Sequence, residues 1–201
     1  MSRHPTSLSP EYFSGMYADD PDPWRFATSG YEHEKYAATL ASLPRDRYAS
    51  VLEVGCSIGV LTRQLANRCE KLTALDVVPS VLESARRMCA SLDHIRFQLA
   101  TVPSEWPDDR FDLILLSEVV YYLDRADLAL LVARVEGSLL PGGDVVLVHY
   151  LGETDYPLTG DEAADGFIET ASAFATLEDQ SRKDGYRIDV LRRTGVEAAR
   201  P

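Results

Sequence analysis

The fold is decided by the stretch Val51-Leu52-Glu53-Val54-Gly55-Cys56-Ser57-Ile58-Gly59. A short apolar run leads directly into a loop with two glycines, and a helical pattern of apolar residues follows over 59–67. Glycine lets the backbone turn sharply and approach a ligand closely. In open α/β sheets, a strand end that faces a helix N-terminus forms the ligand crevice. The loop by itself is also compatible with a strand–helix connection that binds nothing.

The residues after this loop alternate between strand-like apolar runs and helical patterns, which favours a parallel sheet. Pro141-Gly142-Gly143 predicts a tight turn, and Asp184-Gly185 predicts a hairpin. We expect a Rossmann-like α/β fold with five parallel strands, a C-terminal antiparallel hairpin and helices on both faces. The expected strands are 49–54, 71–75, 95–99, 111–116, 144–150, 176–183 and 186–192, and the expected helices are 31–43, 59–67, 79–90, 125–140 and 166–174.

The composition is that of an ordinary globular chain of 201 residues with 45% hydrophobic residues and a formal net charge of −12. No apolar run approaches the roughly 20 residues that span a bilayer, and residues 1–10 lack the apolar core of a signal peptide. Such an acidic protein repels the phosphates of nucleic acids. We therefore expect a cytoplasmic monomer or weak homodimer that binds neither nucleic acid nor membrane.

The cysteines Cys56, Cys69 and Cys89 cannot all pair with one another, and their spacing matches no zinc-binding pattern. We expect reduced thiols in a reducing compartment and no metal site. Cys56 lies inside the glycine loop, where a small side chain fits. We expect it to be a buried loop residue rather than a nucleophile.

A carboxylate follows the second expected strand. Asp76 lies about 20 residues after the glycine loop, the distance at which a carboxylate binds the hydroxyls of a ribose in nucleotide-binding folds. The other interpretation of Asp76 is an acid near the N-terminus of the helix that Pro79 opens. A dinucleotide site needs glycines that seat a pyrophosphate, which Glu53 would repel. Glu53 is better tolerated beside the positive charge of S-adenosylmethionine (SAM).

Taken together, these motifs resemble the class I SAM-dependent methyltransferases over about residues 45–192. Residues 53–59 resemble motif I, and Asp76 resembles the motif II acid. Residues 111–119, with Tyr122-Leu123 after them, resemble the fourth-strand motif, and residues 140–143 resemble the turn before the fifth strand. Ser57 departs from this pattern, because the family usually has glycine there.

The N-terminal segment resembles a narrower family, the NodS-like N-methyltransferases, within which Ser57 is no departure. The similar residues are Asp22-Pro23-Trp24-Arg25-Phe26, Ser29, Tyr31-Glu32, Lys35-Tyr36, Thr39-Leu40, 52–62 and Asp155-Tyr156-Pro157-Leu158. The resemblance implies methylation of an amine, and the member that gives the family its name methylates the deacetylated glucosamine end of a chitooligosaccharide. We expect a helical and aromatic segment, 1–44, to cover the cofactor and acceptor site of a SAM-binding domain, 45–201, within one compact unit.

The resemblance also implies a cofactor site. The glycine loop would lie against the methionine part of SAM, Asp76 would hold the ribose, and Arg25 would pair with the SAM carboxylate. The ends of the third and fourth expected strands would contact the adenine and the amino group. The expected cofactor residues are Trp24, Arg25, Glu53, Gly55, Cys56, Ser57, Gly59, Asp76, Val77, Thr101, Val102 and Ser117.

Methyl transfer needs little chemistry from the protein, because the sulfonium is already an activated donor and the enzyme chiefly aligns the acceptor. An amine attacks in its neutral form, so a nearby base would help. Glu118, Tyr122 and His149 follow or end core strands on the ligand side. We expect Glu118 to orient an ammonium group and take its proton. His149 is the second candidate, because the ordinary pKa of histidine lies near neutrality.

The sequence therefore predicts a SAM-dependent N-methyltransferase whose substrate is a small-molecule amine or the glucosamine end of an oligosaccharide. Three alternatives stay open. They are methylation of another small metabolite by the same fold, a nicotinamide-binding oxidoreductase, and a SAM-binding module without catalysis.

Overall fold

A seven-stranded sheet forms the centre of the protein, in the order β3-β2-β1-β4-β5-β7-β6. The computed structural model describes residues 3–195. Residues 1–2 of the expected segment 1–44 and residues 196–201 of the expected domain 45–201 lie outside the described residues. Strands β1 to β5 are parallel, and β7 runs antiparallel between β5 and β6. The expected α/β fold, with five parallel strands and a C-terminal antiparallel hairpin, is confirmed.

The elements alternate along the chain as the apolar pattern predicts. The strands are β1 (Tyr48–Val54), β2 (Cys69–Asp76), β3 (Ile95–Leu99), β4 (Phe111–Ser117), β5 (Leu139–Tyr150), β6 (Ala175–Lys183) and β7 (Tyr186–Arg193). The helices are α1 (Pro10–Asp19), α2 (Gly30–Ser42), α3 (Val60–Leu65), α4 (Pro79–Met88), α5 (Arg125–Ser138) and α6 (Gly160–Ala171), with short 3-10 turns η1 (Ala66–Arg68) and η2 (Val120–Tyr122).

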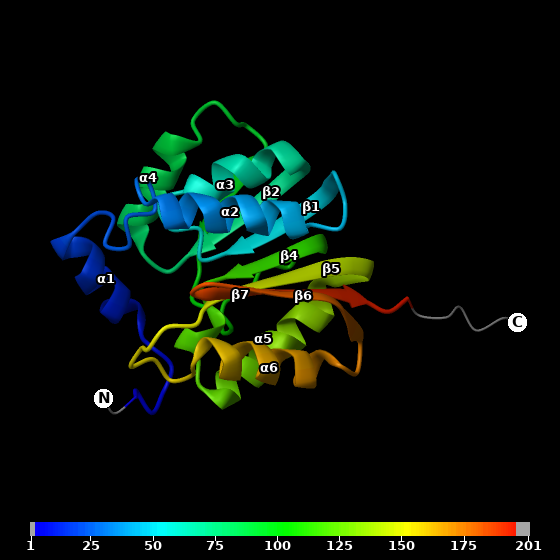
Figure 1. Ribbon diagram of the computed structural model, residues 1–201. Coiled ribbons are helices and arrows are strands. Elements are labelled where there is room, and N and C mark those ends of the chain that lie inside the picture. Colours follow the sequence, from blue (N-terminus) through cyan, green and yellow to red (C-terminus); the bar gives the residue numbers. More distant parts are fainter. Residues whose placement is uncertain (1–2, 196–201) are drawn as a thin grey trace, which may run out of the picture.

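Helices cover both faces of the sheet (Figure 1). On one face α5 and α6 pack against β4 and β5, with Val135 and Phe167 fully buried between them. On the other face α2 and α3 bury Tyr36 and Leu65 against the central strands. Burial on both faces explains why β4 is a nearly continuous run of apolar residues. None of the described helices is both long and apolar enough to cross a membrane.

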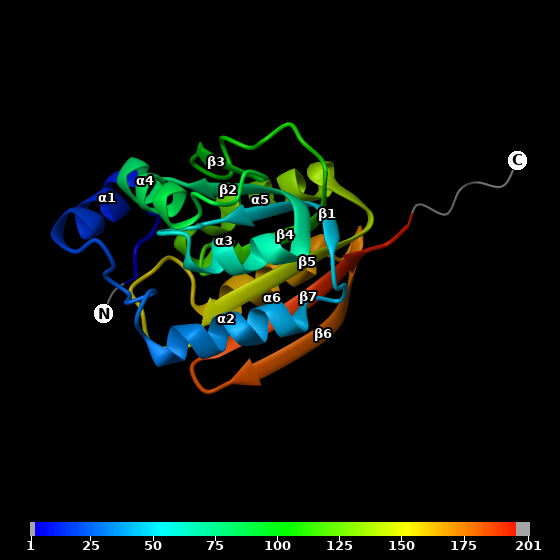
Figure 2. The same ribbon diagram turned by 90° about the horizontal axis from the view of Figure 1, so that it is seen from above.

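The order of the strands determines where a ligand can bind. The chain runs outward from β1 to β3 and then returns to the other side of β1 as β4. Ligands of open α/β sheets bind beyond the carboxyl ends of the strands at such a reversal. Helix α1 lies along this edge of the sheet in both ribbon views (Figures 1 and 2).

Two local expectations need correction, and one helix was not expected. Pro141-Gly142-Gly143 does not separate a helix from a strand, because β5 already begins at Leu139 and this sequence forms a bulge with Gly142 at φ +70°. Helix α6 begins at Gly160 rather than at 166, because Thr159 and Glu162 form a capping box. Helix α1 was not among the expected helices.

Candidate functional site

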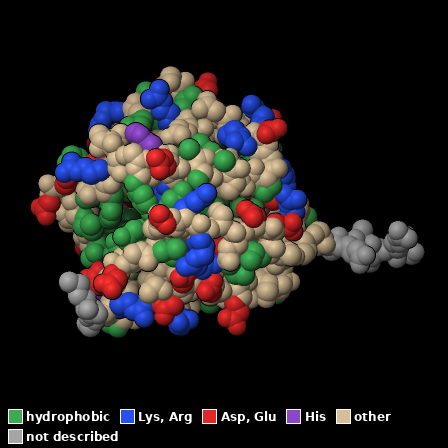
Figure 3. All heavy atoms as spheres, in the orientation of Figure 1, with side chains coloured by type: hydrophobic (Ala, Val, Ile, Leu, Met, Phe, Trp, Pro, Cys, Tyr) green, Lys and Arg blue, Asp and Glu red, His purple; other side chains and the backbone are tan. Residues whose placement is uncertain are grey.

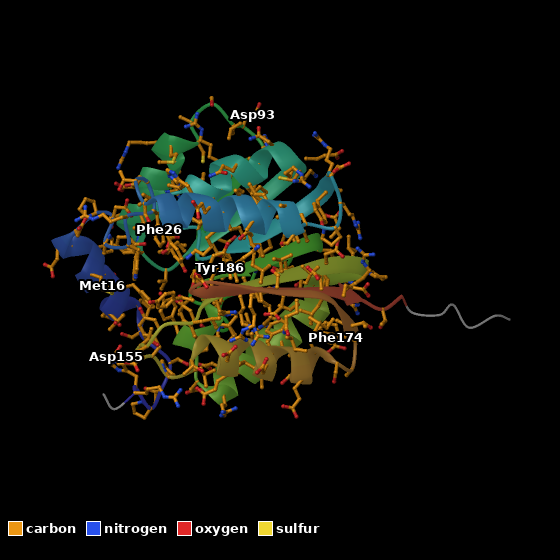
Figure 4. All side chains as sticks on the ribbon, in the orientation of Figure 1. Met16, Phe26, Asp93, Asp155, Phe174 and Tyr186 are labelled. Carbon is orange, nitrogen blue, oxygen red and sulfur yellow. The ribbon has the colours of Figure 1, made fainter. Side chains whose placement is uncertain are left out.

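A pocket opens at the carboxyl edge of the sheet, between the ends of β1, β2 and β4 and the N-terminal segment. It encloses about 1010 Å³, including the part that is open to solvent. Hydrophobic side chains gather on this side of the molecule, around α1 (Figure 3). Phe26 lies between α1 and the first turn of α2 (Figure 4).

The glycine loop forms the floor of this pocket. The backbone N–H groups of Gly55 and Cys56 both donate to the carbonyl of Leu75, so the loop folds back onto the end of β2. Gly55 has φ +81°, and a Cβ atom there would lie 2.5 Å from the Val119 side chain. The backbone at this position therefore lies against the end of β4 with no room for a side chain.

Gly59 has a different role from Gly55. It is the N-cap residue of α3, with φ +86°, and it does not line the pocket. A Cβ atom on Gly59 would lie 2.9 Å from the Cα atom of Ala85 in α4. Gly59 therefore lets α3 and α4 approach each other closely, behind the loop.

Asp76 and Ser57 join the two sides of the loop. The Ser57 N–H donates to Oδ2 of Asp76 at 2.8 Å, and the Val78 N–H donates to Oδ1 at 3.0 Å. A carboxylate has about four acceptor sites, so Asp76, which lines the pocket, can also accept hydrogen bonds from a ligand. Burial raises the pKa of Asp76 to about 6, against the opposing effect of these N–H donors. A contact between Asp76 and a ribose stays a prediction.

Glu53 and Cys56 lie at the base of the loop. Glu53 is 2% exposed and does not line the pocket, and its Oε2 atom has no hydrogen-bond partner among residues 3–195. Burial raises the pKa of Glu53 to about 7. Burial also raises the pKa of the Cys56 thiol, which lines the pocket floor. A thiol in this environment is a weak nucleophile.

Aromatic side chains from the N-terminal segment form the opposite wall. Trp24 stacks on Phe26 with their ring centroids 5.6 Å apart, and Tyr17 meets Trp24 edge to face at 5.5 Å. The hydroxyls of Tyr17 and Ser57 are hydrogen-bonded, so α1 is fastened directly to the glycine loop. Sequence reasoning did not select Tyr17, because α1 was not expected and nothing in the local sequence places it opposite Ser57.

Arg25 lies outside the pocket. It has φ +60°, and its exposed guanidinium contacts the Asp20 carboxylate at 3.3 Å. A contact between Arg25 and a cofactor carboxylate stays a prediction, and it would require this side chain to leave Asp20.

Glu118 lies at the end of β4 and lines the pocket. Its backbone has φ +59°, a conformation that residues other than glycine rarely adopt. Lys35 of α2 donates to Oε1 at 2.6 Å, the Tyr150 N–H donates to Oε2 at 2.9 Å, and the Tyr121 hydroxyl also donates to Oε2. The neighbouring Tyr122 also lines the pocket and meets Phe13 of α1 edge to face at 4.8 Å.

His149 is buried near the end of β5 and does not line the pocket. Its ring lies 5.5 Å from the ring of Tyr121, and both ring nitrogens lack a hydrogen-bond partner within the described part of the chain. Burial lowers the pKa of His149 to about 4, so the ring is neutral at neutral pH. A direct role for His149 as a base stays a prediction that this geometry does not favour.

The structure brings most of the expected site residues together. Those that line the pocket are Trp24, Gly55, Cys56, Ser57, Asp76, Val77, Thr101, Val102, Ser117, Glu118 and Tyr122, and those that do not are Arg25, Glu53, Gly59 and His149. Sequence reasoning did not select Leu8, Phe13, Tyr17, Phe26, Tyr36 or Val119, which line it as well.

Solved structures show the same architecture. A protein from Pseudomonas syringae, provisionally called a methyltransferase, is 34% identical with a TM-score of 0.73, over 82% of this chain and all of that one (100%). The N-methyltransferase NodS from Bradyrhizobium japonicum WM9, solved in complex with S-adenosyl-L-homocysteine, has a TM-score of 0.81 over 92% of this chain and 99% of its own. Its identity is 23%, so this likeness shows the fold.

Sequence comparison gives the family. Nodulation protein S from Rhizobium tropici is 38% identical over 127 residues, which are 62% of this chain and 53% of that protein. The chain thus spans about half the length of the curated relatives it matches. The family model for nodulation protein S matches residues 16–142, which include the glycine loop, Asp76 and Glu118. The chain belongs to the nodulation protein S (NodS) family.

Proposed function

We propose that this protein is a SAM-dependent N-methyltransferase that acts on an amine. Membership of the NodS family supports the activity, and a related N-methyltransferase carries S-adenosyl-L-homocysteine in its structure. The observation that carries the proposal is the arrangement around the glycine loop, where Gly55, Ser57 and Asp76 form one side of a pocket and Glu118 another.

The residues of this pocket fit the chemical groups of SAM. The Asp76 carboxylate lines the pocket and can accept hydrogen bonds from the ribose hydroxyls. Val77 and Val102, from the loops after β2 and β3, add apolar lining to the pocket, which suits a flat base. The aromatic rings of Tyr17 and Trp24 suit a cationic sulfonium, which is attracted to the face of an aromatic ring. None of the described residues that line the pocket is a lysine or an arginine, which disfavours the doubly charged pyrophosphate of a nicotinamide dinucleotide.

SAM supplies an activated methyl group, so the protein's share of the reaction is to bind, orient and exclude water. The Gly55 backbone and Asp76 would fix the donor against the ends of β1 and β2. Tyr17, Trp24 and Phe26 would close the pocket from the solvent side. Glu118 would accept an N–H of the acceptor and so hold the nitrogen at the end of β4.

We further propose that the acceptor is an amine on a sugar, such as the deacetylated glucosamine end of a chitooligosaccharide. Tyr31 is 37% exposed and Tyr150 is 40% exposed, and Tyr150 is the last residue of β5, whose backbone N–H donates to Glu118. Exposed aromatic rings are suited to stacking on the apolar faces of sugar rings. Methylation of another small amine by the same site is the alternative.

Location and association stay proposals as well. We propose that the protein works in the cytoplasm as a monomer or weak homodimer. Its three cysteines are free and buried in the described structure, which is compatible with a reducing compartment.

The test is a methyl-transfer screen with labelled SAM and a panel of acceptors, namely glucosamine oligomers, their N-acetylated counterparts, phosphoethanolamine and simple alkylamines. Calorimetry with SAM and NADH runs in parallel. We expect SAM binding and methylation of free amines only. A protein that binds NADH and does not bind SAM would overturn the proposal. A protein that binds SAM but methylates no acceptor would favour a binding module.

The Glu118→Gln variant then tests the acceptor site. We expect it to bind SAM as the wild type does and to lose at least about tenfold in rate, because a neutral amide no longer attracts an ammonium group. Unchanged turnover would remove Glu118 from the mechanism.

A further inference from the structure

Lys35 is a buried cation beside the pocket, and its contact with Glu118 has been given no role so far. Its side chain is 3% exposed and does not line the pocket. Its ammonium group lies 2.6 Å from Oε1 of Glu118 and 3.1 Å from Oε1 of Glu32, one turn earlier on α2. Lys35 and Glu32 both belong to the N-terminal residues that resemble the NodS-like family. The ion pair between Lys35 and Glu118 joins α2 to the end of β4.

The hydrogen bonds of Glu118 leave it little freedom. Of about four acceptor sites on a carboxylate, two on Oε2 are taken by Tyr121 and the Tyr150 N–H, and one on Oε1 is taken by Lys35. One site remains for a ligand, on the oxygen that Lys35 holds. Lys35 is the donor on the oxygen that carries this last site, so it acts on that site directly.

The charges of the cluster suit a cationic ligand. Lys35, Glu32 and Glu118 together carry a net charge of −1 when all three are ionised, and only Glu118 of the three lines the pocket. Lys35 thus neutralises part of the negative charge and leaves an amount that one ammonium group can balance. A buried charge is costly unless it is paired, and an apolar side chain could fasten α2 to the sheet without that cost.

We propose that Lys35 is a positioning residue for the acceptor amine, which acts by holding the Glu118 carboxylate with its free site toward the pocket. The inference rests on the proposed function, because it requires an amine acceptor that Glu118 contacts. Lys35 itself touches neither substrate.

The test is a double-mutant cycle with Lys35→Met and Glu118→Gln, with a glucosamine tetramer, or whichever panel amine the wild type methylates, as the acceptor. We expect K35M to lower kcat/KM for the acceptor about tenfold or more, while the Kd for SAM stays within about twofold of wild type. In the E118Q background the same substitution should change kcat/KM by less than about twofold, since Lys35 acts only through Glu118.

Lys35→Met leaves the carboxylates of Glu32 and Glu118 without their cation and could fail to fold. The variant Lys35→Met/Glu32→Gln keeps the net charge of the cluster at −1, and we expect it to fold and to show the same loss toward the acceptor. Lys35→Arg retains the charge and should recover part of the activity.

The outcomes separate the two proposals. If the wild type methylates no amine, the proposed function fails and this inference fails with it. If the wild type is active but the effects of K35M and E118Q are additive, or if K35M/E32Q has wild-type kcat/KM, the inference alone is overturned. Equal losses in SAM binding and turnover with a lowered Tm would show that Lys35 is only structural.

Discussion

The backbone N–H of Ser57 donates a 2.8 Å hydrogen bond to Oδ2 of Asp76, so the loop after β1 and the acid after β2 form one unit. Ser57 holds this position with φ +48°, and its hydroxyl is bonded to Tyr17. The carboxylate that would bind a ribose thus also fixes the loop and, through Ser57, the N-terminal helix. A change at Asp76 should therefore affect both ligand binding and loop geometry.

Asp76→Asn should weaken SAM binding about tenfold at pH 7, because a charge-assisted hydrogen bond to the ribose is exchanged for a neutral one. The pKa of Asp76 is raised to about 6 by burial, so the carboxylate is ionised above that pH and protonated below it. Wild-type affinity should rise between pH 5 and pH 7, and that of D76N should stay flat. Calorimetric titration across this range measures both, and equal slopes would contradict the assignment.

The raised pKa of Asp76 affects SAM binding and the stability of the ligand-free protein in opposite directions. Protonation of Asp76 weakens SAM binding but favours the folded state. The folded state holds the Asp76 proton more tightly than the unfolded chain does. The contribution of Asp76 to the free energy of unfolding is therefore complete below the ordinary pKa of 3.8, and it is lost as the pH rises through about 6. SAM should therefore raise Tm more at pH 7 than at pH 5.

Gly55→Ala should destabilise the protein by about 1–3 kcal/mol and weaken SAM binding, because its Cβ atom would lie 2.5 Å from Val119 at φ +81°. Gly137→Ala, in α5 with nothing within 4 Å, is the matched control and should stabilise by about 0.5–1 kcal/mol. Denaturant unfolding measures both changes. G55A/V119A should recover only part of the loss, because the backbone strain remains.

The strands and the glycine loop could be predicted from the sequence because their signals are local. The β3 bounds follow from the alternation of apolar and polar residues in Ile95–Leu99, and Gly55 follows from the turn that ends β1. The contacts that complete the site join distant segments. Tyr17 meets Ser57 across 40 residues, and Lys35 meets Glu118 across 83, so no local pattern reveals either pair. His149 ends a predicted strand, as expected, but its burial depends on the side chains packed around it.

Arg187→Met should destabilise the protein by about 3–5 kcal/mol, because it removes the cation from a buried network. Arg187 is 1% exposed and its guanidinium contacts Asp161, Asp165 and the fully buried Asp189 at 2.7–2.9 Å. Arg182→Met is the matched control, because Arg182 also pairs with Asp161 at 2.7 Å but its side chain is 51% exposed. We expect the control to cost at most about 1 kcal/mol. If both variants lose the same free energy of unfolding in urea, burial does not explain how Arg187 stabilises the protein.

His149 should make the protein less stable in mild acid. Burial lowers the pKa of His149 from 6.5 to about 4, so the unfolded chain binds its proton first. The contribution of His149 to the free energy of unfolding is complete above the pKa that His149 has in the unfolded chain. It is lost, by up to about 3 kcal/mol, as the pH falls through the pKa that His149 has in the folded protein. His149→Leu should flatten this part of the curve of unfolding free energy against pH, while His33→Leu, at an exposed position on α2, should leave it unchanged. If H149L keeps the wild-type slope between pH 7 and pH 4, another group causes the acid sensitivity. If H149L keeps its slope but loses methyl transfer with SAM binding intact, a role for His149 in catalysis would regain support.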